Sequence, residues 1–117
     1  MQYMLLVHSD DSGLENATPE ALEAILAPYM AYNDALRKAG VWVTGEQLAP
    51  AETSHLIRKS DNGMDVLDGP FAEAKEQLGG YYVIAVSSLD DALAWAKRCP
   101  AAEYGTVEVR AIIDNGN

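Results

Sequence analysis

Six consecutive apolar residues, YYVIAV at 81–86, follow directly on the glycine pair Gly79–Gly80. A second apolar run, MLLV at 4–7, lies near the N-terminus. Neither run alternates between apolar and polar residues, as a strand with one face in water would. Both therefore predict strands that are apolar on both faces and lie at the centre of a sheet.

Two helices are predicted between these strands. Apolar residues recur every three or four positions over 18–39 and again over 88–98. Thr18 and Ser88 each place a hydroxyl where the first free amides of a helix need an acceptor, and Gly40 supplies a stop for the first helix. Pro28 falls inside that helix, and its ring predicts either a kink or two abutting helices.

The other strands are predicted over 41–48 and 105–113, with a hairpin over 54–68 that turns at Asn62-Gly63. The order is strand, helix, strand, added hairpin, strand, helix, strand. It predicts one α+β domain over 1–117, a ferredoxin-like β-α-β-β-α-β fold with the hairpin between the second and third core strands. Both helices would cover one face of the sheet, so the other apolar face predicts a homodimer with two sheets packed together.

Composition restricts the possible partners. Eighteen Asp and Glu against eight Lys and Arg give a net charge of −10, and the basic residues are scattered, so no nucleic-acid partner is expected. No apolar run is long enough to span a membrane, and no signal peptide is expected from the N-terminal residues. The single cysteine, Cys99, weakly favours the cytoplasm.

The segment DGPFAEAKEQLGGYYVIAV at 68–86, followed by LDDALAWAKRCPAAEYGTVEVRAI at 89–112, closely resembles the YCII-related proteins of the DGPF type. QYMLLVH at 2–8 and GEQLAP at 45–50 are similar to the same family, so the resemblance covers nearly the whole chain. It implies small bacterial proteins without an established general activity, whose ferredoxin-like subunits pair into a dimeric α+β barrel. Some relatives are linked to extracytoplasmic-function sigma factors. Others carry a His–Asp pair with its histidine on the first helix, whereas residues 18–39 here contain none.

Asp68 and His8 are the candidate catalytic residues. Asp68 begins the rigid turn Asp68-Gly69-Pro70, where burial at a cavity mouth would raise its pKa towards values useful in acid–base catalysis. Alternatively, Asp68 only caps this turn. His8 ends the first central strand on the same face as Met4 and Leu6, and is either an aid to proton transfer or a structural histidine.

The candidate ligand-binding residues are Glu46, His55, Phe71, Glu73 and Lys75. Glu46 faces either the cavity or the solvent, and His55 is either a site residue or a structural histidine. Residues 71–78 fit a helix or an extended segment equally well, and either places Glu73 near Lys75. That pair is either a solvated surface ion pair or, if partly buried, leaves Lys75 as the counterion of an anionic ligand.

Two functions remain open. The first is a small-molecule enzyme with carboxylate and histidine acid–base chemistry in a cavity between paired sheets. The second is a ligand-binding or regulatory module linked to transcriptional control, which uses the same cavity without turnover. No metal-ligand spacing and no dinucleotide or Walker motif is present, so neither a metal nor another cofactor is expected.

Overall fold

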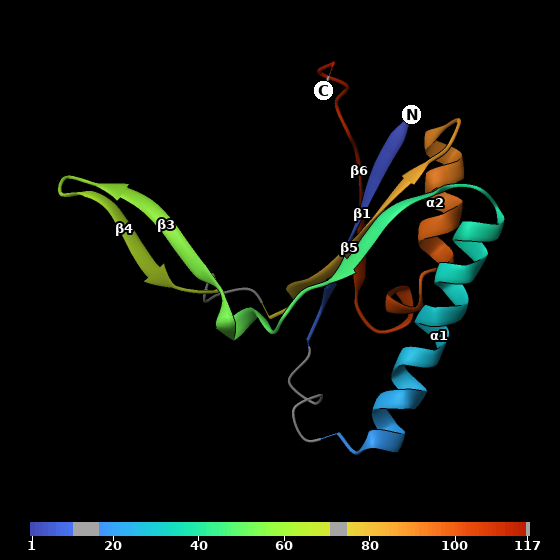
Figure 1. The fold of residues 1–117 in the computed structure, drawn as a ribbon, viewed down its shortest axis with the longest axis horizontal. Coiled ribbons are helices and arrows are strands. Elements are labelled where there is room, and N and C mark those ends of the chain that lie inside the picture. Colours follow the sequence, from blue (N-terminus) through green and yellow to red (C-terminus); the bar gives the residue numbers. More distant parts are fainter. Residues whose placement is uncertain (11–16, 71–74, 117) are drawn as a thin grey trace.

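A computed structural model of the chain describes residues 1–10, 17–70 and 75–116. The elements follow the predicted order (Figure 1). The strands are β1 (Gln2–Ser9), β2 (Trp42–Gln47), β3 (His55–Ser60), β4 (Gly63–Asp68), β5 (Gln77–Ala85) and β6 (Thr106–Ala111). The helices are α1 (Pro19–Lys38) and α2 (Leu89–Arg98), with short 3-10 turns η1 (Ala51–Thr53) and η2 (Pro100–Glu103). The α+β, ferredoxin-like fold class is confirmed.

The core of the fold is an antiparallel four-stranded sheet in the order β2-β5-β1-β6. The two apolar strands, β1 and β5, are central, as the sequence predicts. The hairpin β3–β4 forms a separate two-stranded sheet. Figure 1 shows α1 and α2 to the right of the four-stranded sheet, whereas the hairpin projects to the left.

Helices cover one face of the sheet. Side chains alternate along β1, so that Tyr3, Leu5 and Val7 are buried against the helices. Leu36 of α1 and Ile84 of β5 lie in the same cluster and are fully buried. At about 25 cal/mol per Å² of apolar surface, this cluster is the main favourable contribution to folding.

Side-chain caps define both helix starts. Thr18 Oγ1 accepts a hydrogen bond from the Ala21 amide at 3.1 Å, and Ser88 Oγ accepts one from the Asp91 amide at 3.1 Å. Gly40, at φ +74°, follows the end of α1 in the left-handed region that glycine tolerates. α1 is one helix through Pro28, so the alternative of two abutting helices is wrong. Pro28 is exposed and its ring lies at the helix surface.

The hairpin forms where predicted, but its turn is one residue earlier. Asp61 and Asn62 make the turn, and Gly63 already pairs with Ser60 as the first residue of β4. Gly63 has a positive φ, at +113°, whereas Asn62 does not. The Asn-Gly signal therefore located the hairpin but not its register.

Across the described parts of the chain, none of the helices has the length and apolar character needed to cross a membrane.

Candidate functional site

The face of the four-stranded sheet opposite the helices is called the open face here. Its side chains come from alternate positions on all four strands. The centre is apolar, and the edges are polar: Met4, Leu6 and His8 from β1; Tyr81 and Val83 from β5; Thr44 and Glu46 from β2; Thr106, Glu108 and Arg110 from β6. The open face thus offers an apolar floor with ionisable groups beside it.

His8 and Glu108 form the main polar contact of the open face. His8 Nε2 lies 3.1 Å from Glu108 Oε1, and the two side chains are 27% and 45% exposed. Arg110 Nε lies 3.9 Å from the other carboxylate oxygen, Glu108 Oε2. An imidazole, a carboxylate and a guanidinium are therefore joined through Glu108, and they remain accessible to a ligand.

Strand register gives Glu108 and Arg110 these positions. Leu6 of β1 lies opposite Glu108, and His8 lies opposite Thr106, so His8 and Glu108 are diagonal neighbours on adjacent strands. Leu6 also lies opposite Tyr81, which in turn lies opposite Glu46. Glu46 and Glu108 consequently stand at the two ends of one transverse row, about 14 Å apart at the usual strand spacing.

A second polar contact lies at the same end of the sheet. Thr106 Oγ1 donates to Glu76 Oε1 at 2.8 Å, which ties the segment before β5 to the start of β6. His8 pairs with Leu78 at a register shift in β1–β5. This end of the sheet also adjoins the chain that leads into the hairpin, because the Leu48 amide donates to Gly79 O at 2.9 Å.

Asp68 lies beside His55, with which it is paired at the base of the hairpin. His55 Nδ1 is 3.9 Å from Asp68 Oδ1, and the side chains are 69% and 99% exposed. Within this chain, the hydrogen-bonded partner of His8 is Glu108 rather than either of these residues. The structure therefore presents two separate imidazole–carboxylate pairs.

The structure describes only some of the predicted ligand-binding residues. Glu46 lies on the open face, and Lys75 lies in an exposed bend just before β5. Phe71 and Glu73 lie outside the described residues, so the predicted Glu73–Lys75 pair does as well. Gln77 and Leu78 are extended and belong to β5.

Glu108 is not among the site residues that the sequence predicts. The alternation of Glu108 and Arg110 along the last strand was the available signal. In a ferredoxin-like order β6 adjoins β1, which brings those side chains onto the face that carries His8.

The buried tyrosines and the cysteine belong to the helix side of the sheet. Burial raises the pKa of Tyr32 and Tyr82 above the usual tyrosine value, and it does the same for Tyr29, whose hydroxyl hydrogen-bonds with that of Tyr104. Burial likewise raises the pKa of the Cys99 thiol, which is 1% exposed. These groups stay protonated at neutral pH, so they support packing rather than nucleophilic chemistry.

The raised pKa of Tyr32 predicts a pH-dependent mutant effect. Its hydroxyl donates to Trp95 O at 2.7 Å, so Tyr32→Phe is expected to destabilise the fold by about 1 kcal/mol at pH 7. Above pH 10.0, the ordinary value, Tyr32 ionises in the unfolded state before it does in the folded state. The free energy of unfolding of the natural chain then falls by up to about 1.4 kcal/mol per pH unit, whereas that of the variant does not fall for this reason. Urea unfolding at pH 7 and above pH 10 should show that the difference in stability between the two proteins becomes smaller. A difference that stays constant with pH would contradict the prediction.

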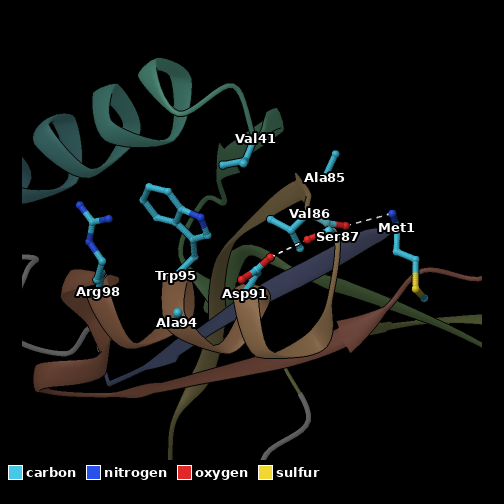
Figure 2. A pocket seen from close by; sticks show the side chains of 9 residues that line it. All are labelled: Met1, Val41, Ala85, Val86, Ser87, Asp91, Ala94, Trp95 and Arg98. Carbon is cyan, nitrogen blue, oxygen red and sulfur yellow. Dashed lines mark hydrogen bonds between the residues drawn. The ribbon is translucent and has the colours of Figure 1, made fainter.

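An open groove of about 680 Å³ lies on the helix side of the sheet (Figure 2). Its wall includes Trp95, with the Arg98 guanidinium 4.4 Å above its ring, and the Ser87 hydroxyl, which donates to Asp91 at 2.7 Å. The Met1 ammonium donates to Val86 O at 3.0 Å. Among the residues that the structure describes, neither an imidazole nor a predicted site residue lines this groove. The acid–base groups therefore belong to the open face and the hairpin.

Within residues 1–10, 17–70 and 75–116, no three His, Cys, Asp or Glu side chains gather as a metal site would require.

Comparison with known proteins agrees with this fold. A protein from Rhizobium meliloti (strain 1021), described as uncharacterized, is 34% identical over 114 residues, covering 96% of this chain and 92% of the relative. Among solved structures, 5-chloro-2-hydroxyhydroquinone dehydrochlorinase (TftG) from Burkholderia phenoliruptrix AC1100, in complex with 2,5-dihydroxybenzoquinone, superposes with a TM-score of 0.58. That match covers 99% of this chain and 97% of the other at 12% identity, which shows a shared fold. The family model for the YCII-related domain matches residues 1–115, and the chain belongs to this family.

Proposed function

We propose that this chain is a small-molecule enzyme that works without a cofactor and uses His8 for proton transfer on the open face of the sheet. The observation that carries the proposal is the 3.1 Å contact between His8 Nε2 and Glu108 Oε1 beside an apolar floor. A histidine held by a carboxylate is a common arrangement for a general acid or base, because the carboxylate fixes the ring and its tautomer.

In this proposal the two ring nitrogens have different roles. Nε2 donates its hydrogen to the carboxylate oxygen Glu108 Oε1. Nδ1 is then the atom that accepts a proton from a bound substrate. Glu108 acts through His8 and is a positioning residue, and Arg110 supplies positive charge for an anionic oxygen of the substrate. Asp68 and Glu46 stay predicted members of the site.

Catalysis at this face requires a cover, and the proposed cover is a second copy of the chain. Met4, Leu6 and Tyr81 are only partly buried at the centre of the open face, and the helices pack against the opposite face of the sheet. Two open faces packed together would bury these side chains and enclose the polar groups in a space with little water. A low-dielectric space strengthens the attraction between Arg110 and an anionic oxygen of the substrate.

The proposed location is the cytoplasm, supported by the single cysteine: Cys99 is a free thiol, which suits a reducing compartment.

The proposed substrates are small organic molecules with an acidic hydroxyl or an acidic C–H bond. The structural neighbour in complex with 2,5-dihydroxybenzoquinone has the same fold, which makes hydroxylated rings and quinones sensible first probes. Their ionised oxygens would match Arg110, and their flat rings would match the apolar floor formed by Leu6 and Tyr81.

The proposal is tested by a metabolite screen that combines native mass spectrometry with product analysis. The expected result is one ligand bound per chain in a dimer, followed by its chemical conversion. Binding without conversion would favour the alternative, a regulatory module that senses a ligand at the same face. Failure of hydroxylated rings, quinones and a broad metabolite set to bind would contradict both functions.

A further inference from the structure

The hairpin β3–β4, residues 55–68, is unsupported in the single chain. It forms its own two-stranded sheet, and an isolated hairpin of this kind is only marginally stable in water. It also extends the molecule, because the radius of gyration is 16.4 Å against about 13 Å expected for a compact chain of this length. Some other surface is therefore expected to hold the hairpin in place.

One face of the hairpin carries most of the exposed apolar surface of the hairpin itself. Cross-strand pairing puts His55 opposite Asp68, Ile57 opposite Val66 and Lys59 opposite Met64, and these three pairs alternate onto the same face. Ile57, Met64 and Val66 are 69%, 71% and 69% exposed. We call this surface the arm face. Three neighbouring side chains at such exposure form a patch that monomeric proteins usually cover.

The direction of the hairpin identifies what covers the arm face. In Figure 1 the hairpin projects away from the four-stranded sheet on the side opposite the helices, which is the side of the open face. A second copy packed on the open face would occupy the space beside it. Face-to-face sheets lie about 10 Å apart, whereas a six-residue strand is about 20 Å long. The hairpin is long enough to pass the facing sheet and lie along the flank of the partner.

We propose that β3–β4 is an arm whose arm face packs against a second copy of this chain, so that each subunit clasps the other. The twofold symmetry of a homodimer makes the contact reciprocal, and both arms are buried together. Lys59 lies on the arm face, and its positive charge is attracted to a partner chain with a net charge of −10. The inference rests on the proposed pairing of open faces and adds to it a second contact surface.

The arm also carries ionisable side chains that would lie at the interface. His55 and Asp68 stand at its base, on the same face as Ile57 and Val66, and their 3.9 Å contact is open to solvent in the single chain. Packing of the arm face would remove water from this pair. The pair would then join the interface between subunits, so that the predicted site residues Asp68 and His55 would act in a cavity that both copies build.

Photo-crosslinking tests the arm directly. A photoreactive amino acid at position 57, on the arm face, is expected to give a covalent dimer in the purified protein. Position 65 is the matched control, because Asp65 lies on the opposite face of the same hairpin. Val66→Lys should also reduce the yield from position 57 at least several-fold, and circular dichroism would show that the sheet and helices persist.

Three measurements, light scattering, cross-linking and turnover, separate failure of the arm from failure of the proposed function. A dimer in light scattering whose cross-linking from position 57 is no stronger than from position 65 would overturn the arm alone. A monomer in light scattering would overturn the pairing of open faces and the arm with it. Absence of turnover in a clasped dimer would leave the arm standing and remove only the catalytic proposal.

Discussion

Leu6→Lys is expected to convert the protein from a dimer into a folded monomer. Leu6 lies at the centre of the open face, between Tyr81 of β5 and Glu108 of β6. In a single chain the new ammonium can reach water and the Glu108 carboxylate, so the fold should persist. In a dimer with paired open faces, one lysine from each copy would enter the interface, and each buried charge without full compensation costs several kcal/mol.

The expected loss is about 1,000-fold or more in the dimer association constant, which corresponds to about 4 kcal/mol. Light scattering should give twice 12.6 kDa for the natural chain and 12.6 kDa for the variant at the same concentration. Met30→Lys is the matched control, because Met30 is an exposed apolar residue on α1, 67% accessible and away from the open face. A natural chain that stays monomeric at high concentration would refute the pairing of sheets.

The sequence predicted the fold well because its signals are local and agree with one another. Thr18 and Ser88 mark the helix starts through hydroxyl caps that depend on only a few neighbouring residues. The apolar runs at 4–7 and 81–86 mark the central strands, because continuous apolar runs are typical of strands in the middle of a sheet. The identity of these strands then determines most of the sheet order.

The contacts of the candidate site were harder to predict because they depend on register. His8 was correctly expected on the face of Met4 and Leu6, but its partner Glu108 lies 100 residues away, on a strand that becomes its neighbour only in the folded sheet. The hairpin shows how sensitive such contacts are. A turn at Asn62-Gly63 would have set His55 opposite Pro70, whereas the observed turn at Asp61-Asn62 sets His55 opposite Asp68.

His8→Asn is expected to abolish turnover of any substrate found for the protein while leaving fold and dimer intact. Asparagine keeps a polar group at the end of β1 but cannot exchange a proton near neutral pH. Loss of a general acid–base group typically lowers the rate by about 100- to 10,000-fold. The side chain is partly exposed, and its contact with Glu108 lies outside the buried core, so the stability change should be small.

Glu108→Gln separates the catalytic role of His8 from a structural one. Glutamine can still hydrogen-bond with His8 Nε2, but it lacks the negative charge of the carboxylate. The expected result is a smaller loss of kcat than for His8→Asn, because His8 keeps the ring that transfers the proton. A structural role would instead give similar losses of kcat in both variants, together with a lower free energy of unfolding. Full activity in His8→Asn would place the chemistry elsewhere, and the His55–Asp68 pair on the arm would be the next group to test.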